Sequence, residues 1–453
     1  MIDTPAARRR YRADAVTILT IYVFFLMGLP SGVNITPLGP IATPAVVMGL
    51  LALLWWANAR LSPRLGMAGG FQPMRIPLFL LGAATLVSYA GAVSHPIADD
   101  VVSRAADKGV ILCAAALGIA FLAADGIDSQ ERLDTLLRRV CLGASLMAVL
   151  GIVQYLTTFD INVVFQQIPG VAPDATLSGI AQRSILRRVE ATARHPIEFG
   201  VVMAMILPIA LHYFMHSPSG RRKNVAALEV VLIGVGLLLS VSRSAILGAV
   251  VAGVYLGLAW NWRQRLNGLV ASAIFVAGAW MAFPGLIGTF SYLILSAGSD
   301  PSITGRTNRY DAIGGFIAQS PLIGRGFRVF GAQNLLITDN QYLNLLIEIG
   351  VLGLCAWILL FLVGVFAARG AYRRTTDPAA AHLSQALGAS VLVLAVTFAT
   401  FDALYYQMDM GLLFLVLGCC GAMWRLHGGP EAFRAPWRGT ARRERPATVV
   451  RTQ

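Results

Sequence analysis

The stretch "ITDNQYLNLLIEIGVLG" (337–353) opens a long apolar run and places one acidic residue directly before it. The predicted span, 339–368, is long enough to cross a bilayer core of about 30 Å, which takes about 20 apolar residues. Eleven more apolar runs occur along the chain: 15–30, 38–57, 76–94, 109–124, 136–157, 196–215, 225–241, 244–260, 267–289, 383–402 and 409–424. This pattern predicts an all-α polytopic membrane protein with about twelve transmembrane helices.

The composition supports the same class of protein. Of the 453 residues, 56% are hydrophobic and only 13% are charged, which excludes an ordinary soluble globular protein. The first run follows a charged segment and leads directly into further runs, so we expect a retained helix and not a signal peptide. We expect a single transmembrane domain over 1–424 and a disordered, basic cytoplasmic tail over 425–453. All five cysteines fall inside predicted spans, which indicates packing residues and not disulfides or metal ligands.

The positions of the basic residues predict the orientation. With the first segment inside, the predicted inner segments hold 25 of the 36 Lys and Arg residues. This satisfies the positive-inside rule and predicts that both termini are cytoplasmic. The net charge of +13 comes mostly from these inner segments, where it meets anionic membrane lipids. A nucleic-acid partner is not expected, because the chain has no contiguous soluble basic domain.

Two long outer loops, 158–195 and 290–338, stand out against otherwise short connections. Each alternates Pro and Gly turns with short amphipathic stretches, so we expect both loops to be partly helical. In the first loop, apolar and basic residues share one segment, which favours a helix lying in the membrane interface. The residues concerned are Ile180, Arg183, Ile185, Arg187, Arg188 and Val189.

Outer segments of membrane proteins are usually poor in arginine, yet here they contain nine. They are Arg183, Arg187, Arg188, Arg194, Arg243, Arg306, Arg309, Arg325 and Arg328. Nearby acids are too few to pair with all of them, and guanidinium groups bind phosphate with two parallel hydrogen bonds. An anionic ligand therefore explains the cluster. The alternative is that individual arginines extend to lipid phosphates.

Three motifs carry the most informative arginines. Arg194 lies in "ATARHPIEFG" (191–200), where His195 precedes a proline suited to the first helical position. Glu198, four residues after Arg194, is placed to form an ion pair with it. Arg243 lies in "SVSRSAIL" (240–247), a minimal turn between two spans. Two further arginines, Arg306 and Arg309, are three residues apart in "SITGRTNRY" (302–310) and share one face if helical.

Four segments in order resemble the O-antigen ligase and polysaccharide polymerase superfamily of bacterial inner membranes. "ARHPIEFG" (193–200) resembles its Arg/His-Pro helix start, and "SVSRSAILG" (240–248) resembles its Ser-Arg-x-Ala turn. "TGRTNRYDAIGGFIAQSPLIGRGF" (304–327) resembles its Gly-Arg … Pro-Leu-x-Gly-x-Gly loop. "DNQYLNLLIEIGVLGL" (339–354) resembles its His-Asn-x-Tyr-Leu … Glu-x-Gly-x-x-Gly helix. The resemblance covers roughly residues 190–365.

The resemblance implies an inverting glycosyltransferase that needs no metal and no cofactor and works at the outer face of the bacterial cytoplasmic membrane. The implied donor is a glycan on polyprenyl (undecaprenyl or decaprenyl) pyrophosphate, and the acceptor is a glycan or a lipid. The ligase histidine is replaced here, which favours a polymerase over a ligase. A transporter or flippase for lipid-linked glycans is the alternative from another class. It should carry ionisable residues or broken helices near mid-membrane.

The resemblance also implies roles for individual residues. Arg194 and Arg243 match the family's pyrophosphate-binding arginines, and Asp339 stands where many ligases have the histidine base, followed by Asn340 as in the family. Asp339 has a second interpretation as a helix N-cap, and His195 is the rival base. Arg306, Arg309 and Arg325 are expected to help bind the donor, with Asn340, Tyr342 and Glu198 in support.

Two other groups of polar residues have structural interpretations. Glu348 is expected to hydrogen-bond a neighbouring helix, because it lies deeper in the membrane than Asp339 and on the other side of its helix. Asp402 and Asp409 flank a tight outer turn and are expected to act as interface anchors.

Overall fold

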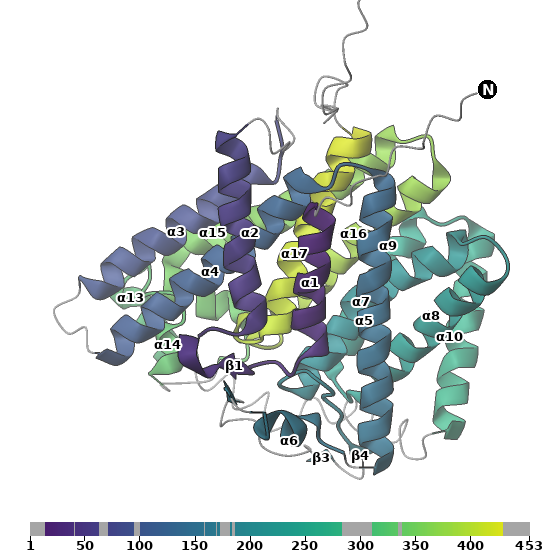
Figure 1. The fold of residues 1–453 in the computed structure, drawn as a ribbon, viewed down its shortest axis with the longest axis horizontal. Helices are drawn as coiled ribbons and strands as arrows, with labels where there is room; N and C mark the ends of the chain where they lie inside the picture. Colours follow the sequence, from purple (N-terminus) through teal and green to yellow (C-terminus); the bar gives the residue numbers. More distant parts are fainter. Residues whose placement is uncertain are drawn as a thin grey trace, which may run out of the picture.

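The computed structural model describes residues 14–39, 41–62, 71–94, 100–157, 159–168, 170–172, 182–183, 186–282, 310–333 and 338–428. Within these residues the chain forms a helical bundle (Figure 1). The long helices are α1 (Ala15–Gly28), α2 (Pro44–Leu61), α3 (Arg75–Val93), α4 (Asp100–Gly126), α5 (Gln130–Thr157), α7 (Pro196–His216), α8 (Arg221–Leu239), α9 (Arg243–Ala259), α10 (Trp262–Ala282), α15 (Gln341–Arg374), α16 (Pro378–Thr397) and α17 (Gln407–Met423). Each overlaps one predicted apolar run.

The class of protein predicted from the sequence is confirmed. Among the described residues, nine helices are long and apolar enough to cross a membrane. α1 and α9 are shorter apolar helices, and α8 is outside both groups. The chain is therefore an all-α multi-pass membrane protein, while the number of twelve spans stays a prediction.

The helix starts follow local sequence chemistry. Thr43 and Asp377 each accept backbone N–H groups of the first turn and stand before a proline that begins α2 or α16. Ser242 caps α9 in the same way. Such side chains satisfy N–H groups that have no partner inside the helix, and proline has a favourable backbone angle at this position.

The burial of side chains differs strongly between the helices of the bundle, with α17 buried and α10 exposed. Every residue from Met408 to Met423 of α17 is buried, whereas in α10 only Ala279 is buried. Small residues allow α2 and α4 to approach closely, because a Cβ atom at Gly118 would lie 2.3 Å from the carbonyl oxygen of Gly49.

Short helices and strands fill the loops. They are α6 (Ile161–Gln166), α13 (Tyr310–Gln319), α14 (Val329–Ala332), the 3₁₀ turns η1 (Thr36–Leu38) and η4 (Ala403–Tyr405), and the π-helical turn η5 (Trp424–Gly428). The strands β1 (Asn34–Ile35) and β2 (Val171–Ala172) pair antiparallel, as do β3 (Gln182–Arg183) and β4 (Leu186–Arg187). Among the described residues, α6 lies within the first predicted loop, and α13 and α14 lie within the second.

The prediction of an interface helix over residues 180–189 is wrong. Residues 182–187 contain the β3–β4 pair, and the chain then continues in extended form. The Val189 amide donates to the Leu239 carbonyl, and the Arg188 guanidinium donates to the Ser240 carbonyl, at 3.4 and 3.2 Å. These bonds to the end of α8 satisfy the backbone without a helix.

Helix α15 is interrupted at Gly350, whose φ of 66° and ψ of −170° are not helical. The segment 321–326 fills the interruption. The amides of Arg325 and Gly326 donate to the carbonyls of residues 347 and 348, and the amides of residues 351 and 352 donate to the carbonyls of residues 321 and 322. A break at membrane depth is stable only when its backbone groups find partners in the protein. The two family motifs around 321–326 and 348–353 therefore pair with each other.

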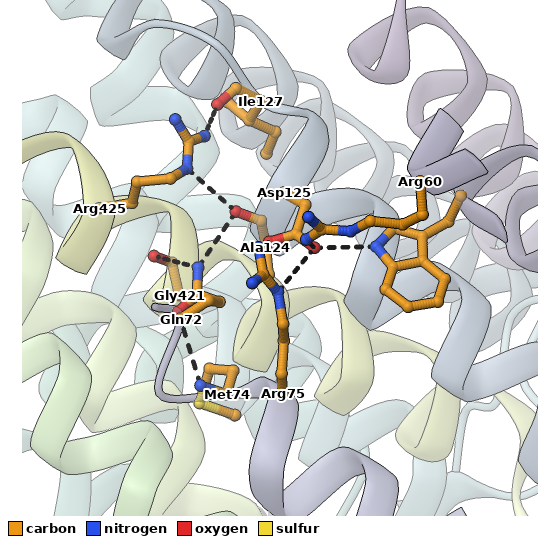
Figure 2. Close-up of polar contacts among 10 residues, drawn as sticks. Arg60, Gln72, Met74, Arg75, Ala124, Asp125, Ile127, Gly421 and Arg425 are labelled. Atoms are coloured by element: carbon orange, nitrogen blue, oxygen red, sulfur yellow. Dashed lines mark hydrogen bonds and ion pairs between the residues drawn. The ribbon is translucent and has the colours of Figure 1, made fainter. Parts of the chain in front are cut away.

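Figure 2 shows a polar cluster that ties together one end of α2, α3 and α4. The buried Asp125 carboxylate accepts hydrogen bonds from Trp56 Nε1 at 2.8 Å and from Arg75 Nη2 at 2.9 Å, and it also contacts Arg60. Gln72 joins α17 to the cluster by donating to the Gly421 carbonyl at 3.0 Å. This polar cluster lies at the opposite end of these helices from the candidate site, which is described below.

Candidate functional site

Helix ends from distant parts of the sequence meet around the buried carboxylate of Glu198. Its Oε2 accepts the backbone N–H of Arg194 at 2.7 Å, and its Oε1 accepts the N–H of Met408 at 2.8 Å and contacts Ser31 Oγ at 3.5 Å. Glu198 thus connects the start of α7, the start of α17 and the loop after α1. An ion pair between Arg194 and Glu198 was predicted, and in the structure the backbone N–H of Arg194 makes this bond while its charge also acts on the carboxylate.

His195 is the N-cap of α7, and its Nδ1 accepts the backbone N–H of Ile197 at 3.1 Å. Its ring lies 5.9 Å from that of Tyr406, centroid to centroid. Burial, and secondarily the charge of Arg188, lower the pKa of His195 to about 4, although Asp339 acts in the opposite direction. His195 is therefore neutral at pH 7. Because Nδ1 is an acceptor, the proton of the neutral ring sits on Nε2, which makes Nε2 a donor and not a base.

Asp339 lies in the left-handed region with a φ of 49°. Its N–H donates to Asp402 Oδ2 at 3.2 Å, and the N–H of Asn340 donates to Asp402 Oδ1 at 3.1 Å. Thr338 Oγ1 also donates to this carboxylate, at 2.5 Å. Asp402 is therefore more than an interface anchor, because it holds all three residues before α15.

The interpretation of Asp339 as the helix N-cap is wrong. The N-cap of α15 is Asn340, whose side-chain oxygen accepts the amides of Tyr342 and Leu343 at 3.1 and 3.3 Å. In a sequence reading Asp-Asn, either residue can cap, and the left-handed backbone at Asp339 moves the cap one position along the chain.

Asp339 and His195 lie close enough to interact electrostatically, although they are far apart in the sequence. The charge of Asp339 acts on the pKa of His195 and also, after burial, contributes to raising the pKa of Asp402. The structure thus brings the two candidate bases together.

A pocket lies at the start of α7, where it is lined by Arg194, the residue directly before His195, and His195 and Asp339 are not among its lining residues. Lys108, Arg194 and Arg328 line it together with hydroxyl and amide groups from Thr43 and Gln407. Among the described residues that line it, none is Asp or Glu, and five residues of α2 and α4 form an apolar wall: Ala45, Val46, Leu112, Ala115 and Ala116. Three cationic side chains next to an apolar surface suit an anion that carries a hydrocarbon chain.

Arg328 was one of nine outer arginines in the sequence and was not singled out. It has a φ of 74°, its Nη1 donates to the Leu404 carbonyl at 2.8 Å, and its guanidinium carbon lies 4.6 Å from the centre of the Tyr405 ring. Burial lowers its pKa, but an arginine stays charged at neutral pH. Nothing in the local sequence indicates that Arg328 faces Arg194, because the two are more than a hundred residues apart.

Two of the other predicted arginines are in the described part of the chain. Arg243 begins α9 beside the Ser240–Ser242 turn, and this turn packs against α7 one turn after His195, at Gly200. Arg325 lies over the Phe316 ring at 5.3 Å and is not among the residues that line the pocket. Arg306 and Arg309 lie outside the described residues.

Two further predicted residues have structural contacts. The Tyr342 hydroxyl donates to the Ala395 carbonyl at 2.5 Å, so Tyr342 ties α15 to α16. The prediction for Glu348 is confirmed, since its Oε1 accepts the Tyr405 hydroxyl at 2.6 Å. Tyr405 in turn accepts the Gly331 amide at 3.0 Å, which fixes the ring on which Arg328 lies.

This geometry defines a multi-pass membrane protein with a cationic pocket beside a carboxylate and a histidine. Residues 228–358 match the family model described as O-Antigen ligase. The match includes three of the four motifs, all but "ARHPIEFG", and it confirms the resemblance to the O-antigen ligase and polysaccharide polymerase superfamily.

Two further comparisons add little. No curated protein matches the chain. Among solved structures, one similar chain comes from work on "structural coordination of polymerization and crosslinking by a peptidoglycan synthase complex". The identity is 18%, the similarity covers 77% of this chain and 95% of that chain, and the TM-score of 0.38 is too low to support a conclusion.

Proposed function

We propose that the protein is an inverting glycosyltransferase that uses a polyprenyl-pyrophosphate-linked glycan at the outer face of the cytoplasmic membrane, and that it polymerises polysaccharide repeat units. The observation that carries the proposal is the pocket lined by the cationic side chains of Lys108, Arg194 and Arg328, in which Arg194 directly precedes His195, and Asp339 acts electrostatically on His195. The O-Antigen ligase match over residues 228–358 supports the same class of reaction.

The residues suggest how the transfer proceeds. The cations bind the pyrophosphate and stabilise the negative charge that grows on it as the bond to the anomeric carbon breaks. An acceptor hydroxyl attacks that carbon from the opposite side, so the configuration inverts, and its proton passes to the Asp339 carboxylate. A carboxylate is a sufficient base when the sugar carbon develops oxocarbenium character. Neutral His195 donates a hydrogen bond from Nε2 to one of the reacting oxygens.

Two alternatives remain distinct from this proposal. A ligase would use the same donor and transfer the glycan to a lipid or surface acceptor. A flippase for lipid-linked glycans is favoured by one observation, the interruption of α15 at Gly350, because broken helices are common in transporters. However, the segment 321–326 occupies that break, and its backbone groups are paired within the chain.

Reconstitution in liposomes tests the proposal with a lipid-pyrophosphate oligosaccharide as both donor and acceptor. Polymerisation gives a ladder of longer glycans, whereas a ligase needs an added lipid acceptor and a flippase moves the donor without new glycosidic bonds. We expect Arg194→Gln and Arg328→Gln each to lower transfer by about 10²-fold, as loss of one charge-stabilising donor does in other enzymes. Arg221→Gln, at the exposed start of α8, is the matched control.

Asp339→Asn tests the base directly. The substitution keeps the size of the side chain and removes its ability to accept a proton, so transfer should be lost while the detergent-solubilised protein keeps its unfolding temperature. Full activity of this variant would contradict the assignment of Asp339 as the base.

A further inference from the structure

Three histidines lie together at the end of α7 that is opposite His195. His212 and His216 are four residues apart on α7, and His382 comes from the first turns of α16. One ring nitrogen from each lies within 4.8 Å of the others. The 21 residues of α7 separate this cluster from His195 by about 30 Å, so it is independent of the pocket.

The rings are arranged as a set of ligands. The Nδ1 atoms of His212 and His382 are 3.3 Å apart, close to the spacing of two ligands on one ion, and the His216 ring centre lies 4.8 Å from that of His382. His216 Nδ1 contacts the carbonyl of His212 at 3.2 Å. This bond puts the proton of His216 on Nδ1 and leaves Nε2 as an acceptor, the arrangement typical of a metal-binding histidine.

We propose that His212, His216 and His382 bind one divalent transition-metal ion of the imidazole-preferring class, which includes zinc, nickel and copper. Three protein ligands leave a fourth position for water. His212 is buried while His216 is exposed, so the site has an entrance from the surface. The ion would hold α7 and α16 together at the end remote from the pocket.

Trp260, which ends α9, makes the proposal more specific. Its Nε1 donates to His382 Nε2 at 3.1 Å, so in this state the proton of His382 lies on Nδ1, facing His212. When Nδ1 takes the metal, that proton moves to Nε2, where it faces the Trp260 N–H. The indole must then turn away. Metal binding should therefore change Trp260 fluorescence, and Trp260→Phe should bind the metal several-fold more tightly.

The test uses the full-length protein, purified in detergent with an affinity tag that contains no histidine. Titration calorimetry with Zn²⁺ should give one ion per chain, and Co²⁺ should show the visible bands of a four- or five-coordinate site. His216→Ala should weaken Zn²⁺ binding by at least about 100-fold, since loss of even an outer partner of a ligand costs 10–100-fold. This position is exposed, so the variant is expected to fold.

His427→Ala is the matched control, because His427 contacts Gln130 at 2.8 Å and is not part of the cluster. Its Zn²⁺ affinity should equal that of the unchanged protein. Absence of stoichiometric binding in the unchanged protein would overturn the proposal, and so would equal affinities of His216→Ala and His427→Ala. These results do not depend on the proposed glycosyltransfer, since they need no glycan substrate.

Discussion

At the scale of single residues, Asp402 determines how Asp339 is presented. A non-glycine residue with positive φ costs about 1–3 kcal/mol, and such strain persists only where neighbouring bonds enforce it. Here the carboxylate of Asp402 takes the hydroxyl of Thr338 and the amides of Asp339 and Asn340. In the reaction proposed above, Asp402 is thus a positioning residue, because it acts through Asp339.

Asp402→Asn tests this role. The amide replaces one acceptor oxygen with a donor, so at least one of the three bonds is lost and Asp339 is released from its fixed conformation. We expect kcat to fall at least about tenfold, with little change in KM for the donor, because the cations of the pocket are unaffected. Asp100→Asn, at an exposed surface pair, is the control. A fall in kcat with a rise in KM and a lower unfolding temperature would indicate a merely structural role.

The pH dependence of stability tests the environment of His195. Its pKa is about 4 in the folded protein, against about 6.5 in an unfolded chain. Between these two pH values the unfolded chain binds more protons than the folded protein. The contribution of His195 to stability is therefore fully present above about pH 6.5 and is lost as the pH falls toward 4. Glu190 has the opposite effect, since burial raises its pKa to about 8 and its contribution falls as the pH rises.

The comparison of His195→Gln with the unchanged protein isolates this contribution. Unfolding temperatures measured at pH 7 and pH 5 should differ less in the variant than in the unchanged protein. An equal loss in both proteins would contradict a buried, neutral His195.

Whether a residue of the candidate site could be predicted from the sequence depends on how far along the chain its partners lie. His195, Arg194 and Asp339 could be predicted, because each stands in a short motif at a helix start. Lys108, Arg328 and Asp402 could not, since their importance depends on residues more than 60 positions away. The same reason hid the histidine cluster, in which His212 and His382 are 170 residues apart.

At the scale of elements, the crossing of α15 with the segment 321–326 is the least tolerant feature. A Cβ atom at Gly350 would lie 2.3 Å from the Leu322 carbonyl, and one at Gly324 would lie 2.3 Å from the Glu348 carbonyl. Both glycines also have positive φ, at 66° and 71°. Only glycine fits two backbones that approach so closely.

We therefore expect Gly350→Ala to destabilise the protein by more than about 1–3 kcal/mol, since steric overlap adds to the backbone strain. Gly253→Ala is the control, because Gly253 lies in α9 with nothing within 4 Å, and alanine favours a helix. Thermal unfolding in detergent compares the two variants. Equal unfolding temperatures would show that the crossing yields easily.

Helices were predicted better than the loops between them. The length and hydropathy of an apolar run are local properties, so each predicted run overlaps one helix, although α4 begins nine residues before its run and α2 begins six residues after its run begins. The course of the chain at Arg188 and Val189 was not predicted, because the end of α8 holds these residues, and no local pattern reveals that contact.

At the scale of the whole molecule, the positive-inside distribution predicts which end of the bundle faces the cytoplasm. In a variant without its native cysteines, Ser219→Cys, at the exposed turn between α7 and α8, should react only with a membrane-permeant thiol reagent. Gln167→Cys, exposed just after α6, should react with an impermeant reagent added outside intact cells. The reverse labelling would place the pocket on the inner side and would exclude the proposed reaction at the outer face.

The bonds around Glu198 and Asp402 have a consequence for the order of synthesis. Glu198 is completed by the amide of Met408, and the approach to Asp339 is completed by Asp402. Met408 lies in the first turn of α17 and Asp402 lies in the connection just before it, whereas α7 begins about two hundred residues earlier. Domains fold progressively as the ribosome delivers them. In the proposed reaction, a nascent chain that ends before Asp402 therefore carries Arg194 and Arg328 but neither of these contacts, so we expect no transfer until insertion is almost finished.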